Sequence, residues 1–106
     1  MIEPIELTGK DLPPPGGRAL LRIGQRCIAV FHVEGQLYAI DDSCPHQGAS
    51  LWGGRLEGRV IQCCAHGLRF DLRSGYLLNS TAVKVANYPV EVFDGQAFII
   101  CEESAP

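Results

Sequence analysis

Residues 44–66 read CPHQGASLWGGRLEGRVIQCCAH and are the most informative segment of the chain. A cysteine and a histidine stand close together at each end, first Cys44 and His46 and then Cys63 and His66, with 16 residues between the two pairs. Thiolate sulfur and imidazole nitrogen are common protein ligands for transition metals. The two pairs therefore make a candidate metal site with four protein ligands.

The order of these ligands bears on the kind of metal site. A zinc finger usually places its two cysteines in one loop and its two histidines in the other, whereas here each loop offers one sulfur and one nitrogen. Mixed loops suit a [2Fe–2S] cluster in which both sulfurs bind one iron and both imidazoles bind the other. A structural zinc site of the Cys₂His₂ type stays open as the alternative.

The sequence around the ligands resembles the Rieske [2Fe–2S] proteins, whose motif is C-x-H followed by C-x-x-H. The resemblance covers most of the chain, from residue 19 to residue 101, and includes the segments CPHQGASL (44–51), GRLEG (54–58), HGLRFDL (66–72) and YPV (88–90). It implies one cluster per chain, an inner iron bound by Cys44 and Cys63, and an outer, solvent-facing iron bound by His46 and His66. The free imidazole nitrogens would then face a redox partner.

Departures from the family pattern narrow the expected function. High-potential Rieske proteins carry a further cysteine in each loop and form a disulfide, whereas this chain has Ala49 and Ala65, so we expect no loop disulfide. They also place hydroxyl donors to the cluster sulfurs where this chain has Leu68 and Phe70. Fewer hydrogen bonds to the sulfurs stabilise the reduced cluster less, so we expect a potential near the low end of the Rieske range, about −150 mV.

These features are similar to those of the ferredoxin component of bacterial ring-hydroxylating dioxygenases. The resemblance implies a soluble carrier that takes single electrons from a flavin-dependent ferredoxin reductase and gives them to a terminal Rieske oxygenase, and that is not itself an enzyme. Two alternatives remain at this stage. One is the small Rieske-like subunit of an assimilatory nitrite reductase, and the other is a zinc-stabilised interaction module.

Length and composition are compatible with this interpretation. The 106 residues fit one domain, and a net charge of −3 with a pI near 5.5 argues against a nucleic-acid partner. The N-terminal segment MIEPIEL lacks the basic and apolar regions of a signal peptide, and no apolar run is long enough to span a membrane. We therefore expect a cytoplasmic protein without a membrane partner.

Short apolar runs rich in Val, Ile and aromatic residues, separated by Gly and Pro, predict an all-β domain of antiparallel sheets. Acid–glycine pairs at 34–35 and 94–95 predict tight hairpins, and the proline-rich segment 11–17 predicts a loop. The predicted strands cover residues 5–7, 19–23, 27–33, 36–40, 90–93 and 97–101. Residues 41–82 would form a small cluster-binding subdomain inserted between base strands from residues 1–40 and 83–106.

Several other residues have simpler interpretations. Cys27 and Cys101 lie in apolar strands and are expected to be buried, because a free cysteine behaves as a small hydrophobic residue. His32 is expected to be a strand residue and not a ligand. Trp52 is expected to shield the cluster, or else to join a docking surface. The four arginines of segment 41–82 are expected on solvated strand faces, with pairing of some of them to acidic groups on a reductase or oxygenase as the alternative.

Overall fold

The computed structural model describes residues 2–43, 50–63 and 67–102, which fold into antiparallel strands and one short 3₁₀ helix. The all-β prediction is confirmed. The elements are β1 (Ile2–Leu7), η1 (Gly9–Asp11), β2 (Arg18–Ile23), β3 (Arg26–Val33), β4 (Gln36–Asp41), β5 (Arg55–Glu57), β6 (Val60–Gln62), β7 (Arg69–Asp71), β8 (Asn87–Tyr88), β9 (Val90–Phe93) and β10 (Gln96–Glu102).

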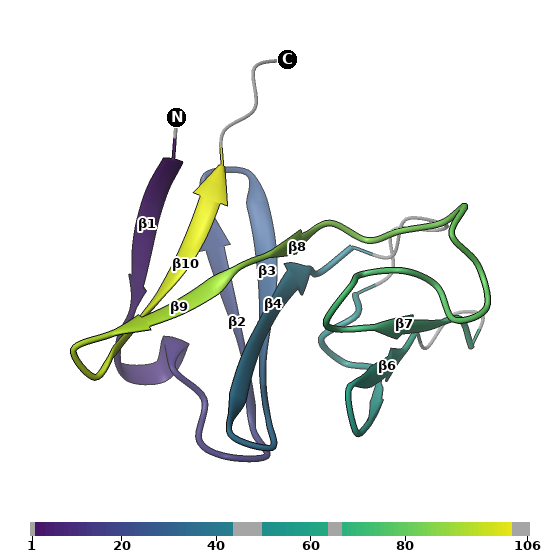
Figure 1. Cartoon of the computed structure of the whole chain (residues 1–106), viewed down its shortest axis with the longest axis horizontal. Coiled ribbons are helices and arrows are strands. Elements are labelled where there is room, and N and C mark those ends of the chain that lie inside the picture. Colours follow the sequence, from purple (N-terminus) through teal and green to yellow (C-terminus); the bar gives the residue numbers. More distant parts are fainter. Residues whose placement is uncertain (1, 44–49, 64–66, 103–106) are drawn as a thin grey trace.

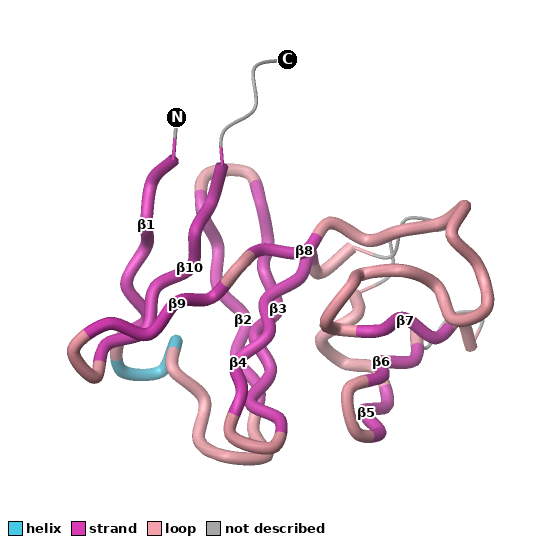
Figure 2. Tube along the Cα trace, viewed as in Figure 1, coloured by secondary structure: helices cyan, strands magenta, loops and turns pink. Residues whose placement is uncertain are grey.

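The strands form three antiparallel sheets, in the orders β1-β10-β9, β2-β3-β4-β8 and β5-β6-β7. Figure 1 shows the four-stranded sheet in the middle, with the sheet of terminal strands on one side and β6 and β7 on the other. Figure 2 shows β5 beside β6 at the far end of this third sheet. The third sheet lies wholly within the predicted segment 41–82, although the boundaries of that subdomain stay a prediction.

Two apolar cores separate the three sheets. The base core lies between the terminal strands and the middle sheet and consists of Leu7, Ala19, Ile28, Val30, Ala39, Ala97 and Ile99. The site-side core lies between the middle sheet and the third sheet and consists of Ala29, Phe31, Val33, Ile40, Leu51, Ile61, Cys63, Phe70, Leu72 and Val85.

Strand β3 contributes to both cores. Successive side chains of a strand point to opposite faces, so Ile28 and Val30 enter the base core while Ala29 and Phe31 enter the site-side core. All four are fully buried. The apolar run at 28–31, which does not alternate with polar residues, therefore reflects a strand that is covered on both faces.

The hairpin turns agree with the sequence prediction. Glu34 and Gly35 have φ values of 51° and 78°, and Asp94 and Gly95 have values of 55° and 76°. Positive φ at both central residues is the requirement of a type I′ turn, whose twist matches that of the flanking strands. The pairs Val33–Gln36 and Phe93–Gln96 close these two hairpins.

The expectation that Cys27 is buried is wrong, because its side chain is exposed. Cys27 points to the same face of β3 as Ala29 and Phe31, but the described members of the site-side core begin at Ala29 and do not reach the start of the strand. The side chain of Cys101, in β10, lies outside the described residues.

The proline-rich loop is fixed against β3. Residue 11, expected in this loop, ends the 3₁₀ helix, and the loop itself begins at Leu12. His32 lies in β3, as predicted, is half-buried, and donates from Nδ1 to the carbonyl oxygen of Pro13 at 3.0 Å. Within the described ranges no helix has the length and apolarity that a membrane crossing requires.

Candidate metal centre

Of the four predicted ligands, the structure describes Cys63. Cys44, His46 and His66 lie outside the described residues, as do Ala49, Cys64 and Ala65. Cys63 directly follows β6, is only 1% exposed and belongs to the site-side core. The structure therefore places Cys63 in an apolar, buried environment, and its role as a ligand stays a prediction.

The loop that begins at Cys63 is closed at its base by backbone hydrogen bonds. The Cys63 N–H donates to the carbonyl oxygen of Leu68 at 2.7 Å, and the Gly67 N–H donates to the carbonyl oxygen of Cys63 at 3.0 Å. Gly67 has a φ of 70°, and a Cβ there would lie 3.2 Å from Nε2 of Gln62. Both the left-handed backbone and the close side chain favour glycine at this position.

Asp42 closes the base of the other loop. Its carbonyl oxygen accepts the Leu51 N–H at 2.6 Å, while its Oδ1 accepts the Ser50 hydroxyl at 2.8 Å and the Trp52 N–H at 2.7 Å. Ser43 and Ser50 also form an antiparallel bridge. Leu51 is fully buried in the site-side core, so the residues that flank segment 44–49 are held by hydrogen bonds and by packing.

Arg18 connects this first loop to the middle sheet. Its Nη1 donates to the carbonyl oxygens of Trp52, at 2.6 Å, and Gly54, at 2.8 Å. The guanidinium carbon lies 5.5 Å from the centroid of the Phe31 ring, within the range of a cation–π contact. No local sequence pattern marks Arg18 as part of the site, because its partners are 34 and 36 residues away.

The first loop ends and the second loop begins at neighbouring points of the third sheet. Arg55 at the start of β5 pairs with Gln62 at the end of β6, and Gln62 pairs with Arg69 at the start of β7. Gly54 fits tightly against this sheet, since a Cβ there would collide with the backbone carbonyl oxygen of Gln62. The exit of the first loop and the entry to the second therefore lie side by side.

A third segment, residues 77–83, lies beside the second loop. A depression of about 370 Å³ is lined by residues of both, among them Leu68, Leu78 and Asn79. Ser80 donates its N–H to the carbonyl oxygen of Leu77 at 3.1 Å and accepts the Ala82 N–H on its hydroxyl at 3.1 Å. These two hydrogen bonds fix the turn.

The described part of the site fits a cluster with an inner thiolate ligand. Cys63 is buried at the foot of a tight loop, and hydrogen bonds hold both loop bases. Phe70 is fully buried and Leu68 packs against the same core, and neither carries a hydroxyl. Among residues 2–43, 50–63 and 67–102, no three His, Cys, Asp or Glu side chains gather into a second candidate metal site.

Comparison with known proteins places the chain in a family. Residues 6–89 match the Rieske [2Fe-2S] domain family. The chain is 36% identical over 97 residues to ferredoxin CarAc of Metapseudomonas resinovorans, which covers 91% of each chain. It is 38% identical over 89 residues to the ferredoxin component of the naphthalene 1,2-dioxygenase/salicylate 5-hydroxylase systems of a Ralstonia species, covering 83% of this chain and 86% of the relative.

Solved structures agree with these sequence matches. One is a complex of reduced oxygenase and oxidized ferredoxin in carbazole 1,9a-dioxygenase, in which a chain of 31% identity superposes with a TM-score of 0.80 over 97% of both chains. Another is a Sphingomonas yanoikuyae B1 ferredoxin, with a TM-score of 0.79 and 25% identity over 94% of this chain and all of that one. The predicted fold and family are thus confirmed: the chain belongs to the Rieske [2Fe–2S] domain family, as a ferredoxin similar to those of aromatic-ring dioxygenase systems, and its cofactor is one [2Fe–2S] cluster.

Proposed function

We propose that this protein is a cytoplasmic one-electron carrier that accepts electrons from a flavin-dependent ferredoxin reductase and delivers them to the terminal Rieske oxygenase of a ring-hydroxylating system. The observation that carries the proposal is the match to ferredoxin components over nearly their whole length, 91% in the case of ferredoxin CarAc. A solved complex of an oxygenase with a ferredoxin, whose matched chain is 31% identical to this one, supports the direction of transfer.

We further propose that Cys44 and Cys63 hold the inner iron and that His46 and His66 hold the outer iron. The burial of Cys63 supports this assignment. When bound, the cluster supplies reversible storage of one electron. The protein's part is to hold the ligands in place, to keep water from the thiolate side and to leave the imidazole side accessible to partners.

The bases of the two loops are suited to hold the ligands in place and to exclude water. Asp42 and Arg18 hold the backbone on both sides of Leu51 through hydrogen bonds of 2.6–2.8 Å. Beneath the loops, Leu51 and Phe70 are fully buried beside Cys63 and exclude water. A frame fixed in this way limits the movement of the ligands when the charge of the site changes, and a small movement favours rapid electron exchange.

Metal analysis and reconstitution test the proposal. The purified protein is expected to contain two irons and two acid-labile sulfides per chain. It should show visible absorbance and, when reduced, an electron paramagnetic resonance signal with the low average g value of a histidine-ligated cluster. Mixed with a flavin-dependent ferredoxin reductase, NADH and a terminal Rieske oxygenase, it should make product formation depend on its concentration. One zinc per chain without iron or sulfide would establish the zinc-stabilised module instead. Product formation that is independent of the protein would refute the carrier function.

A further inference from the structure

The outward face of the third sheet separates its charges in a way that the proposed function does not explain. Cross-strand partners lie on the same face of a sheet, and Leu56, Ile61 and Phe70 form the inward row that packs on the site-side core. The rows on either side of it point outward. One outward row is Arg55, Gln62 and Arg69, and the other is Glu57, Val60 and Asp71.

The basic row is the one next to the ligand loops. Arg55 follows the first loop, Gln62 immediately precedes Cys63, and Arg69 follows the second loop. The acidic row lies at the opposite end of the same short strands. The sheet therefore presents its positive end beside the predicted metal centre, in a protein whose net charge is −3.

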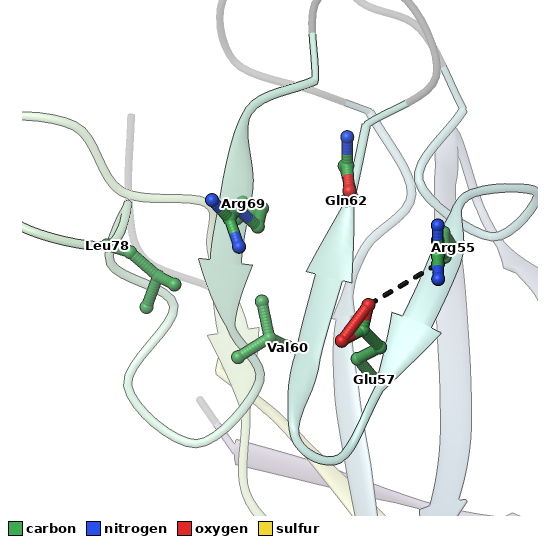
Figure 3. Close-up of a pocket in the computed structure, with 6 residues that line it drawn as sticks. All are labelled: Arg55, Glu57, Val60, Gln62, Arg69 and Leu78. Atoms are coloured by element: carbon green, nitrogen blue, oxygen red, sulfur yellow. Dashed lines mark ion pairs between the residues drawn. The ribbon is translucent and has the colours of Figure 1, made fainter.

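The two arginines flank a pocket of about 110 Å³, drawn in Figure 3, which is lined by Arg55, Glu57, Val60, Gln62, Arg69 and Leu78. The Arg69 guanidinium has no polar partner among the described residues. Arg55 pairs with Glu57 at 3.4 Å, but both side chains are more than 70% exposed, so water screens this pair and a better-placed carboxylate can displace it. Gln62 adds an amide donor, and Leu78, 37% exposed, adds an apolar contact at the edge.

We propose that the surface formed by Arg55, Gln62, Arg69 and Leu78 binds a carboxylate side chain on an acidic surface of a redox partner protein. This inference rests on the proposed carrier function and specifies how a partner is recognised. Guanidinium groups bind carboxylates through paired N–H donors, and an apolar centre with a charged edge is the usual composition of a protein interface. Because the basic row adjoins the ligand loops, a partner that docks there has its acidic surface beside the predicted metal centre.

The chain supplies a matched control. Arg59 and Arg73 belong to the same segment but line a different pocket, together with Gln36 and Tyr38, away from the basic row. Among the described residues, the hydrogen bonds at Arg59 and Arg73 use backbone groups and not the guanidinium groups. Their carbonyl oxygens accept from the Leu72 N–H and the Asn87 side chain, and the Arg73 N–H donates to Oδ1 of Asp71. The double variants R55Q/R69Q and R59Q/R73Q therefore remove the same charge at two places in segment 41–82, the first on the strands of the third sheet and the second in the turns beside them.

The first measurement needs no protein partner. The reduced holoprotein gives one electron to an anionic iron(III)–EDTA complex, forming iron(II), or to a cationic tris(phenanthroline)cobalt(III) complex, forming cobalt(II). In stopped flow at low salt, R55Q/R69Q should slow the anionic oxidant about threefold more than R59Q/R73Q does and should accelerate the cationic one, and these differences should disappear near 1 M salt. Poly-L-glutamate should slow oxidation of the unaltered protein by iron(III)–EDTA and have little effect on R55Q/R69Q.

The second measurement uses the reconstituted system. R55Q/R69Q should retain the visible spectrum and raise the KM for this protein about tenfold with at least one partner, leaving kcat within twofold, because the arginines dock the partner and do not carry the electron. Equal behaviour of the two double variants in both measurements would overturn the proposed surface while the carrier function stood. Failure of the unaltered protein to support product formation would instead count against the carrier function, and the small oxidants would still report the charge beside the loops.

Discussion

Replacing Arg18 by methionine should loosen the first ligand loop without unfolding the sheets. The substitution removes both hydrogen bonds from Nη1, to Trp52 and Gly54, and the charge over the Phe31 ring. Methionine keeps most of the side-chain volume, so the apolar stem still packs. Arg22, exposed on the same face of β2, is the matched position for an identical substitution.

The expected cost follows from the geometry. A hydrogen bond from a charged donor contributes about 1.5–3 kcal/mol to stability. We use the lower value for both hydrogen bonds of Arg18, because Arg18 is half-buried and its hydrogen bond to Trp52 is exposed to solvent. Exposure reduces the sum to about 2 kcal/mol, which corresponds to about thirtyfold in an equilibrium constant. The cost should appear as local opening of residues 50–56, because the residues bound by Arg18 lie in this segment.

Hydrogen exchange followed by mass spectrometry measures that opening. In the holoprotein, the peptide that contains the Trp52 and Gly54 amides should exchange about thirtyfold faster in Arg18→Met and less than threefold faster in Arg22→Met. Release of iron in mild denaturant should accelerate in the same order. Equal exchange in the two variants would refute the argument that Arg18 fixes the first loop.

Three further predictions concern the site and its frame. Gly54→Ala should lower the free energy of unfolding by about 1–3 kcal/mol, because the new Cβ collides with a backbone carbonyl of β6. Thermal unfolding measures the change, and Gly53→Ala, whose Cβ meets open space, is the control. Cys63→Ser should abolish the visible absorbance and the bound iron, whereas Cys27→Ser, at an exposed thiol, should leave both unchanged; a coloured Cys63→Ser would contradict the ligand assignment. Leu68→Ser should raise the reduction potential by about 40 mV, since one new hydrogen bond of about 1 kcal/mol favours the reduced state. Voltammetry that shows no rise would exclude that donor effect.

Local patterns predicted most of the fold. The acid–glycine pairs located both type I′ hairpins, because few residues adopt positive φ at two successive positions. The apolar run 27–33 located β3 to within one residue. The same run does not show how far the covering layers extend. The prediction of a buried Cys27 is therefore wrong, because the described site-side core ends at Ala29.

The candidate site was predicted less evenly. The assignment of Cys44, His46, Cys63 and His66 as ligands rests on the sequence, because a few residue types at close spacing carry the chemistry, and it stays a prediction. The hydrogen bonds that hold the loop bases could not be predicted in this way. Arg18 binds Trp52 and Gly54 across more than 30 residues, and its neighbours in the sequence do not distinguish it from other strand arginines. The separation of charges on the third sheet could not be predicted from local patterns either. It depends on the strand register that aligns Arg55, Gln62 and Arg69 in one row.

Strand β3 limits how this sequence can vary. In a strand with one wet face, alternate positions accept most polar residues, but residues 28–31 of β3 have no such position, since each is fully buried in one core or the other. A change of volume at any of them disturbs packing either toward the terminal strands or toward the ligand loops. This strand should therefore be the least tolerant of random mutagenesis among those described, even though it supplies no predicted ligand.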